Sequence, residues 1–337
     1  MFKFSIILLL FFTNTFATVY LDKSKFKALT FKPVEDAPRI LRPEEVRYQV
    51  IGPTEILVKI FLRKNNIEKE IKTLDFPIPT CAKQGGRYEI ERTLKNKYIG
   101  ILKTNYYKIS ATIECGKENN LIFDHNSFGG QSLSIWDIAN TAVNKFKKID
   151  RLAFWKKRIN VQWPGLGDFY AWGEVNITKG HRWDIVAHEL GHAIYQLANI
   201  GKFGGGSHKI DQCYSHKMAI SEGWASYFAA WLGISLDDPD AKFEYLVPRR
   251  APIHIEHVPE DVCAGETNEW RVTSFLWDLI DRNDDHEEVD LLFKTLWDVT
   301  KEMNFFKTSQ IAQKLKLEVM DPILLNILWE NNFLKPL

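Results

Sequence analysis

The sequence His188-Glu189-Leu190-Gly191-His192, near the middle of this 337-residue chain, constrains its fold more than any other feature. On an α-helix, residues four apart lie one above the other, so the two imidazoles can reach the same metal ion. Glu189 projects beside that face, where it can touch a water molecule held by the metal. Apolar residues recur around the motif at helical spacing, so we expect a half-buried helix over residues 184–198 with its histidines toward a cleft.

Two histidines leave a catalytic zinc ion one protein ligand short, because three protein ligands plus water is the usual arrangement. Ala198 stands where the longer metzincin pattern has a third histidine, which excludes that family. The best candidate is Glu222, which opens a second apolar helix expected over about residues 217–232, because a catalytic ligand is best held on a rigid element. The alternatives in the segment before Glu222 are His208, Asp211 and His216.

With His-Glu-x-x-His followed downstream by a helical Glu and small residues, the chain resembles the gluzincin metallopeptidases over roughly residues 155–235. The resemblance implies a zincin-like α+β fold and a Zn²⁺ cofactor. It also implies an enzyme that hydrolyses peptide bonds, with a peptide or protein as substrate. Carried over position by position, it makes His188, His192 and Glu222 the zinc ligands and Glu189 the general base.

Other residues that serve such a site are less clearly marked. Ser226 stands where thermolysin-like members often carry an acid, so we expect the group that orients a histidine to come from elsewhere. Residues of the next expected helix, 269–281, are more simply interpreted as ion pairs near the surface than as members of the site: Glu269, Arg271 and Asp278. The group that stabilises the developing oxyanion is expected among Tyr245, His254, His257 and Arg271.

Residues 169–177 are expected to form one exposed edge strand before the motif helix. An extended peptide can bind to such an edge by adding a strand to the sheet. The residues expected to contact the substrate are therefore Tyr170, Ala171 and Trp172.

Residues 1–17 have the pattern of a secretory signal peptide: one positive charge, a short apolar run, and small residues before an expected cleavage after Ala17. We therefore expect a secreted or periplasmic protein without a stable membrane anchor once the segment is removed. An even count of four cysteines in an exported chain suggests two disulfides. Spacing favours the pairs Cys81–Cys115 and Cys213–Cys263, each within one expected domain.

Residues 18–125 contain short alternating runs separated by Gly and Pro turn signals, which predicts an all-β, sandwich-like domain. We interpret it as a spacer or substrate-positioning module, with an inhibitory propeptide as the alternative. Residues 126–337 are expected to form the catalytic domain with a helical C-terminal part, so the fold class is α+β. Further helices are expected at 134–146, 287–303 and 309–316.

The charge balance limits the possible partners. Lys and Arg number 44 and Asp and Glu 43, so the chain lacks the basic excess that binding to a phosphate backbone requires, and nucleic acid is not a favoured partner. The alternative to a peptidase is a secreted binding or adhesion protein, in which the β domain binds the partner and the zincin fold is not catalytic.

Overall fold

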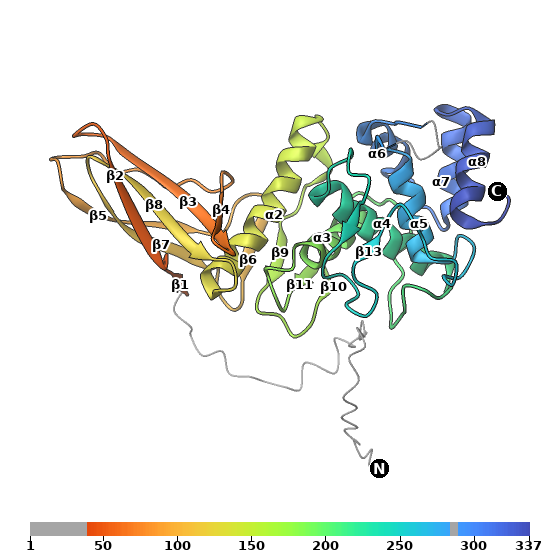
Figure 1. The fold of residues 1–337 in the computed structure, drawn as a ribbon, viewed down its shortest axis with the longest axis horizontal. Coiled ribbons are helices and arrows are strands. Elements are labelled where there is room, and N and C mark those ends of the chain that lie inside the picture. Colours follow the sequence, from red (N-terminus) through yellow and green to blue (C-terminus); the bar gives the residue numbers. More distant parts are fainter. Residues whose placement is uncertain (1–38, 284–288) are drawn as a thin grey trace, which may run out of the picture.

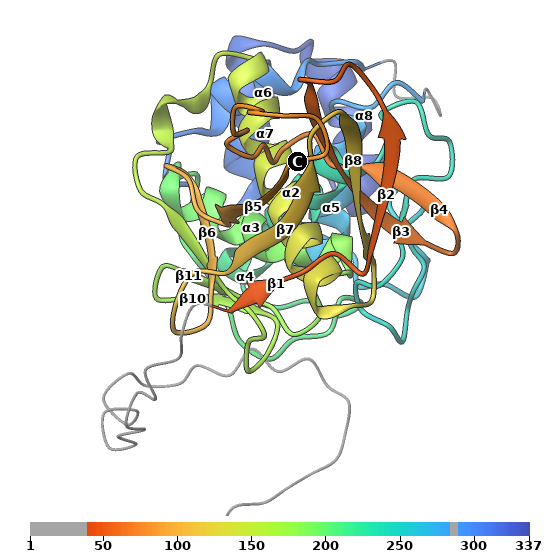
Figure 2. The same cartoon turned by 90° about the vertical axis from the view of Figure 1, so that its left-hand side faces the viewer.

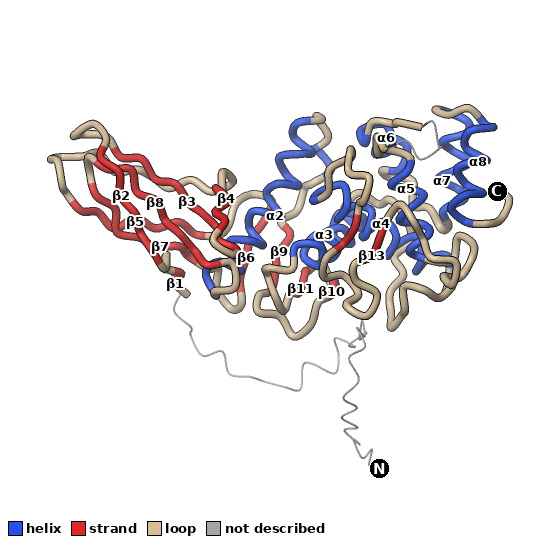
Figure 3. The backbone as a smooth tube through the Cα atoms, viewed as in Figure 1, coloured by secondary structure: helices blue, strands red, loops and turns tan. Residues whose placement is uncertain are grey.

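The computed structural model describes residues 39–283 and 289–337, which form a mixed α+β protein. Strands gather at one end of an elongated molecule and helices at the other (Figure 1, Figure 3). The expected signal peptide lies outside the described residues. None of the helices in the described ranges has the length and apolar character to cross a membrane.

Two small sheets make up most of the N-terminal part, and Figure 2 views them along the long axis. One sheet has the order β2-β8-β3-β4 and the other β1-β7-β5. Alternate residues of a strand face opposite sides, and in β3 Ile60 and Leu62 are the buried pair. The strands are β1 (Ile40–Leu41), β2 (Glu45–Val50), β3 (Ile56–Lys64), β4 (Ile67–Glu70), β5 (Arg87–Thr93), β7 (Lys108–Glu114) and β8 (Lys117–Asp124).

A third sheet joins strands from both sides of residue 125. Its order is β10-β11-β9-β6, and β6 (Ile99–Leu102) pairs in parallel with β9 (Ile159–Gln162). The buried apolar residues form one cluster that runs from Leu41 to Phe333. The strands of the two expected domains therefore share a sheet and a core, and a boundary at residue 125 stays a prediction.

Helix α2 (Phe128–Lys148) lies between the strands and the other helices (Figure 1). It begins six residues before the expected start because Ser127 caps it, its hydroxyl accepting from the Gly130 N–H. A Cβ at Gly130 would lie 1.8 Å from the Asp124 carbonyl oxygen, so only glycine lets the helix start so close to β8. The other helical segments are a 3₁₀ turn at Leu152–Phe154, α3 (Trp183–Leu197), α4 (His216–Gly233), α5 (Glu269–Asp278), α6 (Phe293–Thr300), α7 (Thr308–Glu318) and α8 (Pro322–Phe333).

The expected single strand over residues 169–177 is wrong. The segment is a hairpin of β10 (Phe169–Ala171) and β11 (Glu174–Asn176). Trp172 and Gly173 have φ of 52° and 83°, and two successive positive φ values make the tight turn that suits a two-residue hairpin loop. Strand β10 forms the edge of the sheet. A small hairpin of β12 (Lys242–Phe243) and β13 (Ile253–His254) lies farther along the chain.

Two other features of the C-terminal part differ from expectation. Helix α6 begins only at Phe293, and residues 284–288, which include the expected start of that helix, lie outside the described residues. Sequence reasoning missed α8, which the Asp321 side chain caps and whose first residue is Pro322.

Both expected disulfides are confirmed, between Cys81 and Cys115 and between Cys213 and Cys263.

Candidate metal centre

Two glycines let three helices pack closely around the centre. A Cβ at Gly191 of α3 would lie 2.8 Å from the Ala225 carbonyl oxygen of α4. A Cβ at Gly223 of α4 would lie 2.6 Å from the Cβ of Val272 and 2.9 Å from the Glu269 carbonyl oxygen, both on α5. Such short distances to backbone atoms leave no room for a side chain, so α4 is held tightly between α3 and α5.

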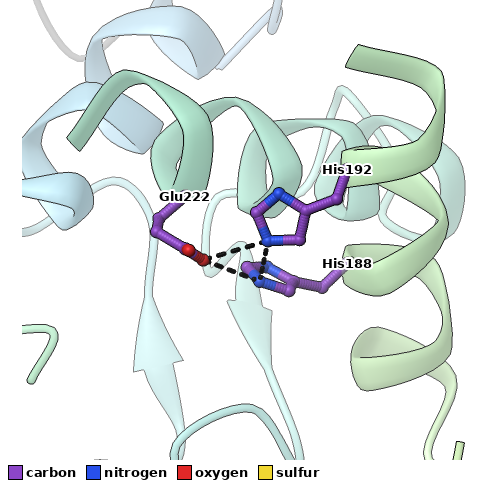
Figure 4. Close-up of side chains that lie close together, drawn as sticks. All are labelled: His188, His192 and Glu222. Atoms are coloured by element: carbon purple, nitrogen blue, oxygen red, sulfur yellow. Dashed lines mark hydrogen bonds and ion pairs between the residues drawn. The ribbon is translucent and has the colours of Figure 1, made fainter. Parts of the chain in front are cut away.

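His188 and His192 of α3 and Glu222 of α4 point toward one another (Figure 4). The Nε2 atoms of the histidines are 3.2 Å apart, and Oε2 of Glu222 lies 3.2 Å from His188 Nε2 and 3.0 Å from His192 Nε2. All three residues are buried, with exposed fractions of 8%, 4% and 3%.

This donor set fits a divalent transition-metal ion. Ligand atoms about 2.0–2.1 Å from a tetrahedral zinc ion lie about 3.3–3.4 Å from one another, close to the spacing of these three atoms. Two imidazoles and one carboxylate are also a ligand set found at catalytic zinc sites. The histidine and glutamate group could therefore hold a metal ion.

The orienting group for His188 is Ser226, which corrects the expectation that it comes from elsewhere. Ser226 Oγ lies 3.1 Å from His188 Nδ1, and Ser221 Oγ lies 3.5 Å from His192 Nδ1. Both serines belong to α4, as Glu222 does. When each Nδ1–H donates to its hydroxyl, each Nε2 presents a lone pair to the centre.

The carboxyl groups of Glu189 and Glu222 differ in pKa. Burial raises the pKa of Glu189 to about 8. Burial also opposes ionisation of Glu222, but when the neighbouring histidines are protonated, the charge of His192, hydrogen bonds from His188 and His192 and the charge of His208 outweigh it and hold its pKa well below the usual value. The Glu222 carboxylate is thus suited to stay ionised beside a cation.

Of the three alternative ligands before Glu222, the structure brings only His208 to the centre. Its Nε2 lies 3.8 Å from Glu222 Oε2. Asp211 instead pairs with Arg250, with oxygen and nitrogen 3.1 Å apart, and His216 lies 3.7 Å from a Glu266 oxygen.

Sequence reasoning placed Glu269, Arg271 and Asp278 near the surface, which is wrong. Glu269 is buried and its Oε2 lies 3.2 Å from His208 Nε2, so it belongs to the surroundings of the centre. Arg271 is 2% exposed and donates to three backbone carbonyls, those of Val262, Cys263 and Asn332. Asp278 is buried and accepts from the Asn332 amide at 2.6 Å.

The described polar contacts of three of the four expected oxyanion residues are with groups outside the centre. Arg271 donates its hydrogen bonds to backbone carbonyl groups, as described above. The Tyr245 hydroxyl lies 3.2 Å from Lys64 Nζ, His254 pairs with Asp240 at 3.0 Å, and His257 is exposed. His208 was already named from the sequence as an alternative ligand, whereas sequence reasoning missed Ser221, whose hydroxyl oxygen lies 3.5 Å from His192 Nδ1.

The expected substrate residues lie at the sheet edge. Tyr170 is buried, and its hydroxyl donates to Gln196 of the motif helix. Its ring centroid is 6.1 Å from that of Phe203, which is 5.7 Å from that of His192, so the edge strand lies one aromatic ring away from the histidines. Ala171 is half-buried, and Trp172, in the turn, is 52% exposed.

Comparison with protein families identifies one similarity. The family model described as the Mycolysin C-terminal domain matches residues 158–323, just under half of the chain. The match runs from β9 to the start of α8 and includes every residue of the histidine and glutamate group. It suggests a peptidase, and together with that group a metallopeptidase. A search of curated proteins finds no match.

Proposed function

We propose that the protein is a secreted zinc peptidase that hydrolyses peptide bonds, with His188, His192 and Glu222 as zinc ligands and Glu189 as the general base. The observation that carries the proposal is that two Nε2 atoms and one carboxylate oxygen lie 3.0–3.2 Å from one another. They belong to helices α3 and α4, which pack closely at Gly191. The family match over residues 158–323 supports the same reaction class.

When bound, the zinc ion would polarise the scissile carbonyl and lower the pKa of water toward about 7. Glu189 follows His188 on α3, and the residue is 8% exposed. Burial favours its protonated form, whereas the positive charge of a nearby cation favours the carboxylate. A carboxyl group balanced in this way can accept a proton from the attacking water and pass it to the departing amine.

Strand β10 is where we place the substrate. It forms the edge of its sheet, and an extended peptide added there would lie beside the motif helix, to which Tyr170 is hydrogen-bonded. Tyr170 then acts as a link between sheet and helix, because its side chain is buried. Ala171 and the exposed Trp172 are left as the contacts for a substrate.

The test is Glu189→Gln, which preserves the shape of the side chain and removes its basicity. We expect the variant to keep one zinc ion at the site by elemental analysis while its casein-cleavage rate falls about 10²–10⁴-fold, the usual contribution of a general base. Glu244→Gln is the matched control, because Glu244 is exposed and pairs with Lys64.

Two results would contradict the proposal. A fully active Glu189→Gln variant would exclude Glu189 as the base. A wild-type protein that holds zinc but cleaves neither casein nor a peptide library would favour a secreted binding protein with a non-catalytic zincin fold.

A further inference from the structure

We propose that His208, Glu222 and Glu269 form a second divalent-cation site that shares Glu222 with the first, so that the centre binds two ions. The inference rests on the proposed function in one respect, namely that Glu222 is a ligand of the first ion. The site would take a transition-metal ion such as Zn²⁺, since imidazole and carboxylate are ligands that suit it.

The ligand atoms lie at suitable separations. His208 Nε2 is 3.2 Å from Glu269 Oε2 and 3.8 Å from Glu222 Oε2. Two ligands each about 2.1 Å from one ion can be at most about 4.2 Å apart, so both distances allow a shared ion. Glu222 belongs both to the group with His188 and His192 and to the group with His208 and Glu269. Hydrolytic enzymes with two metal ions hold them about 3.5–4 Å apart, so one carboxylate can bind both ions.

The imidazole of His208 is oriented as a ligand. Its Nδ1 lies 2.9 Å from the carbonyl oxygen of Gly206. A carbonyl can only accept, so Nδ1 carries the proton of the neutral ring, and Nε2 presents its lone pair to two carboxylates. Three acceptors then converge on one point. Histidines that bind metals have this arrangement, with the other ring N–H donated to a carbonyl or carboxylate.

Glu269 provides an independent indication. Its side chain is 8% exposed, and within the described part of the chain Oε2 accepts no hydrogen bond, because the 3.2 Å contact with His208 Nε2 lacks hydrogen-bond geometry. Burying an ionised carboxylate without a donor is unfavourable, and a cation at this point would compensate the charge. A second proton on His208 would supply a positive charge as well, so the experiment must separate a metal ion from an imidazolium.

The segment that carries His208 is fixed to the start of α5, which carries Glu269. A disulfide joins Cys213 to Cys263. The Asn268 amide donates to the carbonyls of Ile210 and Gln212 at 2.8 Å and 3.0 Å. Such attachments hold His208 and Glu269 at a fixed separation, which a preorganised metal site needs.

The experiment counts metal ions in the full chain. The protein is stripped of metal, loaded with Zn²⁺ alone, dialysed against metal-free buffer and analysed by mass spectrometry. We expect two zinc ions in the wild type, and one in His208→Asn and in Glu269→Gln. Loss of a residue that only orients a ligand weakens metal binding by about 10- to 100-fold. Loss of a ligand should weaken binding at the second site by more than that.

Two variants serve as matched controls and should keep two ions: His254→Asn and Glu244→Gln, whose side chains pair with Asp240 and Lys64. A near-ultraviolet circular dichroism spectrum shows that each variant is folded. One zinc ion in the wild type would overturn this inference and leave the proposed function intact. Two ions retained in His208→Asn would also overturn it, and none in the wild type would overturn both proposals.

Discussion

Nδ1 of His188 lies 3.1 Å from the hydroxyl oxygen of Ser226, one helical turn after Glu222 on α4. One helix therefore supplies a candidate ligand and also the group that orients a second ligand on the neighbouring helix. A neutral hydroxyl performs this role where a carboxylate would add a negative charge to a buried site. The close contact of Gly191 with Ala225 makes the arrangement possible.

Replacing Ser226 by Ala should weaken zinc binding by about 10- to 100-fold, because the His188 ring loses the acceptor that fixes its tautomer. The affinity is measured by competition with a chromophoric chelator. Ser221→Ala is the comparison, and its effect should be smaller, because Ser221 is 3.5 Å from His192 Nδ1. Equal losses in the two variants would argue against an orienting role specific to Ser226.

Removing the metal should destabilise the fold. An ion that binds only the folded chain stabilises it by about 2.7 kcal/mol when its concentration is 100 times the Kd. We therefore expect a chelator to lower the midpoint of thermal unfolding of the wild type. His188→Ala, which loses a ligand of the first ion only, should respond less than the wild type; an equal response of both proteins would mean that His188 does not hold an ion.

Gly191→Ala should lower the free energy of unfolding by about 1–3 kcal/mol, because the new methyl group would force α3 and α4 apart. Zinc affinity should fall with it, since the two helices carry the ligands. Urea denaturation measures the first effect and chelator competition the second. In the control variant Gly52→Ala, the three atoms nearest to the added Cβ all belong to the flexible side chain of Glu55, and we expect a change within about 0.5 kcal/mol. A Gly191→Ala protein as stable as this control would show that the helices can separate at no cost.

Lys145 should make stability depend on pH. Burial, and the nearby charge of Lys148, lower its pKa to about 8, while its ammonium donates to the Trp231 carbonyl. The unfolded chain has a lysine pKa near about 10.4 and so binds more protons between the two values. The free energy of unfolding should therefore rise with pH from about 8 to about 10.

The comparison is with Lys145→Met, which retains the apolar stem of the side chain. Subtracting the two pH profiles cancels the titration of other groups. We expect the wild type to gain about 2 kcal/mol relative to the variant over this range. A difference that stays constant with pH would show that Lys145 keeps its ordinary pKa in the folded protein.

Helical periodicity and local turn chemistry were sufficient to locate the main elements around the site. The helix expected over residues 184–198 is Trp183–Leu197, and the one expected over 217–232 is His216–Gly233. The hairpin at 169–177 was not recognised, because it depends on a positive φ at Trp172, which a bulky residue seldom adopts.

The sequence by itself determined that His188 and His192 share a helix face, because a spacing of four residues closes one helical turn. Glu222 was already the best candidate for a third ligand from the sequence, but only the tertiary structure decided that it lies beside the histidines and which other groups surround them. Glu222, Ser226, His208 and Glu269 are distant in sequence, and their positions depend on how closely the helices approach at Gly191 and Gly223. A periodic pattern indicates which face a helix buries; which residues of another helix meet that face is set by packing.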